Sequence, residues 1–244
     1  MSRPKRSPNI VILFADDLGY GDLSCFGGAP GATPHLDRAA ADGTRWTSFL
    51  VSQPVCSASR ASLLTGCYSN RLGIHGALGP DARHGLNPNE TTIADLAKSR
   101  GYVTACFGKW HLGHHREFLP LRHGFDQYWG IPYSNDMWPR HPEAPKAYPP
   151  LPTFENDRIV KPDTTPDDQS TMTTEITGRA VDFIARNRNR PFLLYLPFPM
   201  PHVPLFAGKA WRGRSGRGTY GDVLREIDHA VGAVRGALER YGLA

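Results

Sequence analysis

The chain has 244 residues, 40% of them hydrophobic and 21% charged, which is enough apolar material for one large folded domain and excludes a wholly disordered protein. Its formal net charge of +5 suits an anionic substrate. The basic stretches carry no aromatic interleaving and no binding motif, so we expect solvated surface there and no nucleic-acid partner.

We expect no signal peptide in the sequence as written. Arg3, Lys5 and Arg6 are basic, but the apolar run from Ile10 to Ala15 is too short for the core of a signal peptide. No segment is long enough to cross a membrane. As written, the chain is expected in the cytoplasm, or in the periplasm or outside the cell if the true start lies upstream.

The first predicted element is a strand buried on both faces, because Asn9–Phe14 is a short apolar run rich in β-branched residues. A helix is expected over Thr33–Ala41, with Pro34 at its first position and Gly43 just past its end. A shorter helix is expected over Ser59–Thr65. These are separate elements joined by long loops.

The rest of the chain alternates between helix and strand, which is typical of an α/β sheet. Gly130–Asp168 is rich in proline and shows no periodicity, so we expect an irregular excursion that covers the site. The predicted regular elements are, in chain order, a helix over Thr92–Arg100, a strand over Tyr102–Phe107, a helix over Thr171–Arg188, a strand over Pro191–Pro197 and a helix over Tyr220–Tyr241.

Polar side chains follow all three predicted strands. Asp16 and Asp17 leave the first, Lys109 and His111 follow the second, and His202 follows the third. Ligands of doubly wound folds bind at the carboxyl ends of the strands. The sequence therefore predicts one site at this edge of the sheet.

Asp16 and Asp17 are candidate metal ligands. Two adjacent carboxylates repel each other unless a cation lies between them, and oxygen ligands favour a hard ion such as Ca²⁺ or Mg²⁺. The alternative is that one carboxylate caps the following turn. Sequence alone leaves both interpretations open.

Cys56 is a candidate nucleophile. The four cysteines form no CxxC pair and no zinc pattern. Cys56 precedes a predicted helix, whose N-terminus together with Arg60 could lower the pKa of the thiol. A plain buried apolar cysteine is the alternative, and composition alone favours it.

Lys109 and His111 lie two residues apart, so in an extended segment their side chains point to the same side. A cation beside an imidazole suits the binding and protonation of an anionic ester. A surface lysine and a histidine bonded to backbone are the alternative. His202, between two prolines, is either a poised acid or a structural residue.

Several motifs in the same order resemble the sulfatase family. They are Asp16–Asp22, Thr33–Asp37, Cys56–Gly66 and Gly108–Gly113, while Gly130–Ser134 and Arg214–Gly218 resemble its arylsulfatases. The resemblance covers nearly the whole chain. It implies an alkaline-phosphatase-like α/β sandwich with a mainly parallel central sheet.

The resemblance also implies a mechanism. Cys56 would be oxidised to formylglycine by a formylglycine-generating maturase, and one hydroxyl of the aldehyde hydrate would attack the sulfur of a sulfate ester. The other hydroxyl would then lose its proton, so that the sulfated hemiacetal collapses and releases sulfate. The substrate would be a sulfated small molecule, glycan or lipid.

Residue roles follow by position in the motifs. Asp16, Asp17 and the modified Cys56 would hold a divalent metal, Ca²⁺ or else Mg²⁺. Arg60 and Lys109 would stabilise the aldehyde hydrate and the sulfate charge.

Three further roles are implied in the same way. His111 would take the proton during collapse, His202 would bind the sulfate and protonate the leaving alcohol, and Ser134 would hydrogen-bond near the sulfate.

The sequence departs from the family pattern in two places. Ala58 stands where the signature usually has proline. The chain also reaches Ala244 just before the strand on which the family carries an Asp-Asn pair of metal ligands. We therefore expect residues 1–244 to be an N-terminal catalytic domain, incomplete at the C-terminus and with little activity alone.

Two alternative functions remain at this point. One is a phosphate-ester hydrolase of the same fold, although such enzymes usually have Ser or Thr in place of Cys56. The other is a catalytically dead protein that binds anions or partners.

Overall fold

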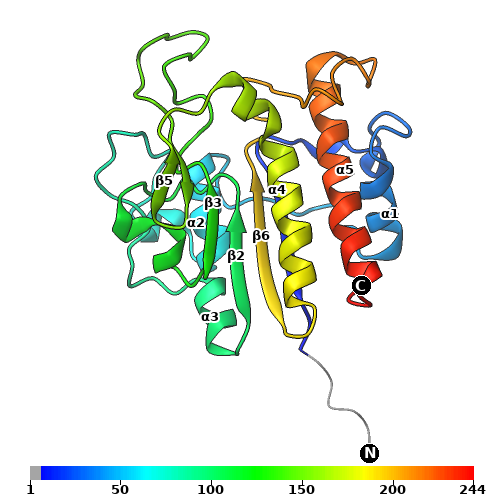
Figure 1. Ribbon diagram of the computed structural model, residues 1–244, viewed down its shortest axis with the longest axis horizontal. Coiled ribbons are helices and arrows are strands. Elements are labelled where there is room, and N and C mark those ends of the chain that lie inside the picture. Colours follow the sequence, from blue (N-terminus) through cyan, green and yellow to red (C-terminus); the bar gives the residue numbers. More distant parts are fainter. Residues whose placement is uncertain (1–6) are drawn as a thin grey trace, which may run out of the picture.

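The computed structural model describes residues 7–244, so the basic Met1–Arg6 segment lies outside the described residues. The centre of the fold is a six-stranded sheet in the order β1-β6-β2-β3-β4-β5 (Figure 1). The first four strands in this order run parallel, and the last two form an antiparallel hairpin. The strands are β1 (Ile10–Ala15), β2 (Val103–Phe107), β3 (Gln127–Gly130), β4 (Thr153–Glu155), β5 (Arg158–Lys161) and β6 (Phe192–Phe198).

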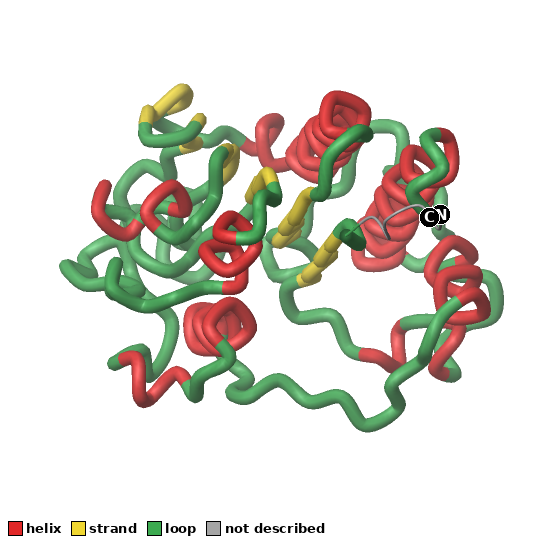
Figure 2. Tube along the Cα trace, turned by 90° about the horizontal axis from the view of Figure 1, so that it is seen from below, coloured by secondary structure: helices red, strands yellow, loops and turns green. Residues whose placement is uncertain are grey.

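Helices cover both faces of the sheet (Figure 2). One face is covered by α4 (Pro166–Asn187) and α5 (Gly218–Arg240), and the other by α2 (Cys56–Thr65) and α3 (Ile93–Ser99). The remaining helix, α1 (Pro34–Asp42), packs against α5. Within residues 7–244, none of the helices is both long and apolar enough to span a membrane.

Short 3-10 helices lie in the connections, at Tyr20–Asp22, Ser24–Phe26, Ser69–Leu72, Arg116–Phe118 and Pro120–Arg122.

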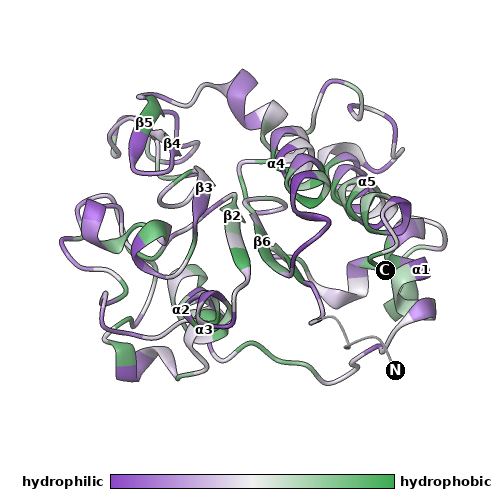
Figure 3. Ribbon diagram, turned by 60° about the horizontal axis from the view of Figure 1, so that its bottom comes forward, coloured by the Kyte–Doolittle hydropathy of each residue, from purple (hydrophilic) through white to green (hydrophobic). Residues whose placement is uncertain are grey.

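Strand β6 explains why continuous apolar runs mark this sheet. Successive side chains of a strand point to opposite faces, so Leu194 and Leu196 pack under α4 and α5, whereas Leu193 and Tyr195 pack toward α2 and α3. All of β6 is buried, and it is coloured hydrophobic in Figure 3. A strand covered on both faces therefore shows no alternation in sequence.

The three predicted strands and five predicted helices are confirmed in place, but several details need correction. Strand β1 is not buried on both faces, because it is an end strand and all its residues are partly or fully exposed. The helix expected from Ser59 begins at Cys56. The helix expected from Thr171 begins at Pro166, because Thr165 and Asp168 form a capping box. The excursion over residues 130–168 is not wholly irregular, since β4 and β5 lie within it. Strand β3 was also missed.

Strand β1 is the end strand of the sheet, and apolar side chains on it and beside it are exposed to solvent. Leu13 is 37% exposed, and Phe49 and Leu50 are 71% and 85% exposed. Leu13 and Phe49 line one cavity with Tyr20. An apolar surface therefore lies beside the free edge of the sheet.

Candidate active site

Side chains from four strand ends meet at the carboxyl edge of the sheet. Asp16 follows β1, Lys109 follows β2, Ser134 follows β3 and His202 follows β6. Cys56 joins them from the first residue of α2. The sequence predicted that the ends of three strands meet at this site. The structure adds a fourth strand, β3, which was not predicted from the sequence.

Gly108 allows Lys109 to enter this group. Its φ of 135° lies in a region that favours glycine, and a Cβ here would lie 2.1 Å from the Pro197 carbonyl oxygen. The Gly108 N–H donates to the Trp129 carbonyl (2.8 Å) and the Lys109 N–H to Pro197 (2.8 Å). The backbone after β2 is therefore held between β3 and β6, with Lys109 facing inward.

Asp16 is the centre of the charge arrangement. Lys109 Nζ donates to Asp16 Oδ2, and Arg60 Nη2 lies 3.3 Å from the same oxygen. All three side chains are buried. Burial alone would raise the pKa of Asp16, but the charges of Arg60 and Lys109 outweigh it and lower that pKa to about 2. Asp16 is therefore an ionised carboxylate between two buried cations.

Arg60 is fixed from three sides. It follows Cys56 by one turn of α2, and its Nη1 donates to the backbone carbonyl of Lys109 (2.5 Å). Its guanidinium carbon lies 5.4 Å from the centroid of the Phe14 ring. The contact with Asp16 is an ion pair without hydrogen-bond geometry, since Nη2 makes no hydrogen bond within residues 7–244.

Lys109 also contacts Ser134, because Nζ donates to the Ser134 hydroxyl (2.9 Å). An ammonium has three donors, and Asp16 and Ser134 take two of them. One donor of Lys109 thus remains for a ligand.

His111 differs from its prediction in backbone geometry. The segment is not extended there, because His111 has a φ of 58°. The imidazole is buried with Nε2 2.9 Å from the Leu78 carbonyl, so Nε2 must donate, and Nδ1 has no partner among the described residues. Burial and then the charges of Lys109 and Arg60 hold its pKa well below 6.5. His111 is therefore a neutral imidazole with a free acceptor.

The pKa of His202 is shifted in the opposite direction. Its Nε2 lies 3.7 Å from Asp17 Oδ2, and its Nδ1 faces the Val203 carbonyl. Burial lowers the pKa of His202, but a hydrogen bond with Cys56 and the charge of Asp16 outweigh that effect and raise it. His202 therefore keeps a proton at a higher pH than His111 does.

Cys56 and Cys106 are chemically distinct. Cys56 is partly exposed and lies within hydrogen-bond reach of His202. Cys106 is fully buried in the sheet, and burial strongly raises the pKa of its thiol. Only the first of these thiols is open to chemistry from the site.

The metal site stays a prediction. Asp16 and Asp17 bring carboxylate oxygens to the edge of the sheet, and Asp17 has a φ of 61°. Across residues 7–244, no three His, Cys, Asp or Glu side chains form a cluster that could hold a metal. The two carboxylates have the chemistry of a hard-cation site but fall short of the six to eight ligands that Ca²⁺ takes.

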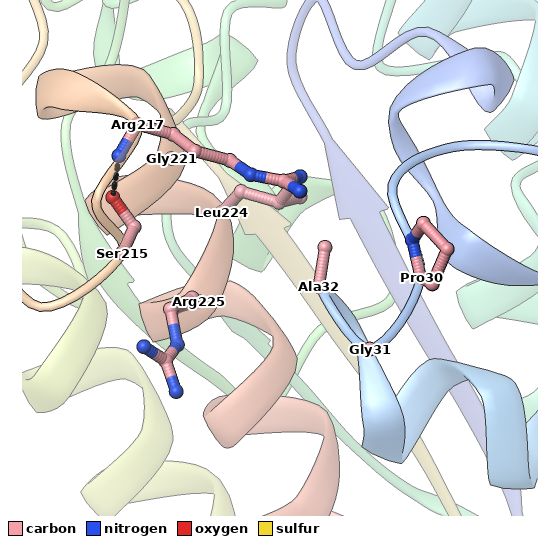
Figure 4. A pocket seen from close by; sticks show the side chains of 8 residues that line it. All are labelled: Pro30, Gly31, Ala32, Ser215, Arg217, Gly221, Leu224 and Arg225. Carbon is pink, nitrogen blue, oxygen red and sulfur yellow. Dashed lines mark hydrogen bonds between the residues drawn. The ribbon is translucent and has the colours of Figure 1, made fainter.

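A cavity of about 170 Å³ lies beside the start of α5. Figure 4 shows Arg217 extending across it toward Pro30 and Ala32, whereas Arg225 points away. None of the candidate site residues lines it. The cavity is therefore separate from the group around Asp16.

One buried polar residue at the site was missed from the sequence. Asn135 follows Ser134 and is fully buried, with its side-chain amide near the His202 segment. Its only signal was its position beside Ser134. Asparagine next to a motif residue is too common to be singled out without the structure.

Comparisons with known proteins identify relatives that match nearly the whole chain. The Sulfatase family model matches residues 8–244. Human arylsulfatase A is 41% identical over 98% of this chain and 50% of its own length. The chain thus spans about half the length of this relative.

Two solved structures extend the comparison to the fold. The PsFucS1 sulfatase from Pseudoalteromonas sp. is 27% identical, with a TM-score of 0.86 over 98% of this chain and 53% of its own. A protein bound to its substrate, D-glucosamine-2-N,6-O-disulfate, is 29% identical, with a TM-score of 0.61 over 82% of this chain and 35% of its own. The predicted alkaline-phosphatase-like α/β fold is confirmed, and so is the origin of the motifs: this chain belongs to the sulfatase family.

Proposed function

We propose that residues 1–244 form the N-terminal catalytic part of a sulfate-ester hydrolase in which Cys56, converted to formylglycine, is the nucleophile. The observation that carries the proposal is the grouping of Cys56, Lys109 and His202 around the buried carboxylate of Asp16. This group combines an accessible thiol, a cation with a free donor and a proton carrier. Those are the parts that displacement at an anionic sulfur centre requires.

Position 56 suits a modified nucleophile. As formylglycine it would supply an aldehyde hydrate whose hydroxyl can attack sulfur. The residue begins α2, where backbone N–H groups have no helical partner and favour nearby negative charge.

The sulfate would be held by Lys109, Arg60 and Ser134. Lys109 has one donor not used by Asp16 or Ser134, and Ser134 is held beside it at 2.9 Å. Arg60 adds a second buried positive charge. Because these cations are fixed before substrate binds, they can stabilise charge on the sulfate without rearranging.

The two histidines have different proton roles in this proposal. His202, whose pKa is raised, protonates the leaving alcohol, while His111, whose pKa is lowered, accepts a proton at its free Nδ1 when sulfate is released. The two environments push the pKa values apart, which is the usual way in which one site provides an acid and a base.

A divalent metal, Ca²⁺ in preference to Mg²⁺, would be held by Asp16, Asp17 and the modified Cys56. A flexible set of oxygen ligands suits Ca²⁺ better than the strict octahedron that Mg²⁺ demands. Further ligands would be needed, because residues 7–244 form no cluster of three His, Cys, Asp or Glu side chains. The metal would neutralise charge between the carboxylates and the sulfate.

The substrate class in this proposal is a sulfate ester of a small molecule, glycan or lipid, and the maturation partner is a formylglycine-generating enzyme. A sulfated sugar is supported by the related structure bound to D-glucosamine-2-N,6-O-disulfate.

The test uses residues 1–244 joined to the part of human arylsulfatase A that they do not match, produced with a formylglycine-generating enzyme and Ca²⁺. The joined protein should hydrolyse an aryl sulfate, Cys56→Ala should abolish turnover, and Cys67→Ala, at an exposed thiol, should keep it. Faster turnover of the matching aryl phosphate, or full activity in Cys56→Ala, would refute the proposal.

A further inference from the structure

Asn135 connects α4 to the segment that carries His202. Its side chain is fully buried. Its backbone carbonyl accepts a hydrogen bond from Nε2 of Gln169 (3.0 Å), a buried residue in the first turn of α4. The position of Asn135 is thereby fixed by a long helix that belongs to the core.

The amide of Asn135 faces three consecutive carbonyl groups. Nδ2 lies 3.5 Å from the carbonyl oxygens of His202 and Val203 and 3.4 Å from that of Pro204. Each contact is longer than an ordinary hydrogen bond, so the two N–H groups are shared among the three acceptors. The opposite amide orientation would place Oδ1, an acceptor, against three carbonyl oxygens that also only accept. The amide is therefore oriented with Nδ2 toward the three carbonyls.

The Val203 carbonyl has a second contact, with Nδ1 of His202. A carbonyl oxygen can only accept, so Nδ1 of His202 must carry a hydrogen. The other ring nitrogen, Nε2, then faces Asp17 at 3.7 Å. The Val203 carbonyl therefore sets both the tautomer and the direction of the His202 ring.

We infer that Asn135 is a positioning residue for His202: by holding the 202–204 carbonyls, it keeps the Val203 carbonyl where it binds Nδ1 and leaves Nε2 directed at the reacting atoms. The inference rests on the proposed function, in which His202 protonates the leaving alcohol. Asn135 acts only through the backbone, and no contact between it and substrate is required. Ring orientation through a hydrogen bond to the other nitrogen is a general device of histidine sites.

The test reads the tautomer directly and needs no enzymatic activity. Residues 1–244 labelled with ¹⁵N-histidine are examined by long-range ¹H–¹⁵N NMR at a pH where the His202 ring is neutral, and His202→Gln identifies its signals. The wild type should show His202 predominantly protonated at Nδ1. Asn135→Ala should lose this preference, so that the shifts of the two ring nitrogens converge.

Two further variants keep the test decisive. Asn135→Leu fills the same space without an N–H and should also lose the preference, so it keeps the test readable if Asn135→Ala unfolds the chain. Asn187→Ala is the matched control, since Asn187 is also buried and its Nδ2 donates to the Phe183 carbonyl (2.8 Å) near the C-terminal end of α4. It should leave the His202 signals unchanged.

The inference is overturned if wild-type His202 is protonated at Nε2, if both Asn135 variants keep the wild-type shifts, or if Asn187→Ala moves them equally. A failure of the proposed function would appear separately, as a joined protein without sulfatase activity whose His202 tautomer still depends on Asn135.

Discussion

Lys109 and Asp16 form a buried ion pair although β6 separates the strands that they follow. Lys109 is fully buried, and Asp16 is 5% exposed. Arg60 supports the pair from α2. The sheet edge therefore holds two cations against one carboxylate, which leaves net positive charge for a bound anion.

Lys109→Met should destabilise the chain by about 3 kcal/mol, because removal of one partner leaves a buried charge less well compensated. Urea unfolding at neutral pH measures this. The control is Lys98→Met, which removes an ion pair with Asp126 (2.7 Å) whose lysine side chain is 54% exposed. It should cost less than about 1 kcal/mol. Equal losses would mean that the buried pair has no special role.

His202→Ala should slow alkyl sulfates by about 10²–10⁴-fold and nitrophenyl sulfate far less, because an activated leaving group needs little protonation. The assay uses the joined protein. His141→Ala is the matched control, since His141 also lies near a carboxylate, with Nε2 3.8 Å from Asp136. If His202→Ala slows both substrates equally, His202 is not the acid.

His123 should make the chain less stable in acid. Its ring is fully buried, 5.7 Å from that of Trp110, and burial lowers its pKa from 6.5 to about 4. Between these values the unfolded chain binds a proton that the folded chain does not, so the contribution to stability is present above pH 6.5 and is lost as the pH falls toward 4.

The expected loss from His123 is about 2 kcal/mol between neutral pH and about pH 5. His123→Phe should remove this part of the pH dependence, whereas His75→Phe, at an exposed position, should keep it. Free energies of unfolding in urea at the two pH values decide the matter. An unchanged pH dependence in His123→Phe would show that another group is responsible.

The sequence predicted the parts of the fold that have strong local patterns. Strands β1, β2 and β6 are continuous apolar runs, and such runs are visible without the structure. Strand β1 is nevertheless only partly buried, because it is the end strand of the sheet. Strands β3, β4 and β5 have four residues or fewer, so their length does not distinguish them from loop. They also share no burial pattern, since β3 and β4 are mostly buried and β5 is mostly exposed. The early start of α4 had a sequence signal, the Thr165–Asp168 capping box.

The sequence predicted which residues come together at the site but not the contacts between them. Motifs identified Asp16, Lys109 and His202, but the buried pairing of Asp16 with Lys109 depends on strand order. The backbone is not extended at His111 because this residue has a positive φ, which residues other than glycine seldom adopt. The contact of Asn135 with the 202–204 carbonyls joins segments that no local pattern connects.

Residues 1–244 alone should show little sulfatase activity and weak Ca²⁺ binding. Asp16 and Asp17 supply too few of the six to eight oxygen ligands that Ca²⁺ takes, so the metal would be held weakly and would add little positive charge where the sulfate binds. Calorimetric titration with Ca²⁺ and an aryl sulfate assay, both compared with the joined protein, test this. Turnover of the isolated chain equal to that of the joined protein would show that residues 1–244 complete the site by themselves.

The central prediction, that Cys56 becomes formylglycine, is tested most directly by mass spectrometry of the peptide that contains Cys56, from protein produced with a formylglycine-generating enzyme. We expect an aldehyde in place of the thiol at Cys56, while the exposed thiol of Cys67 stays intact. An unmodified thiol at Cys56 in a joined protein that hydrolyses aryl sulfates would contradict it.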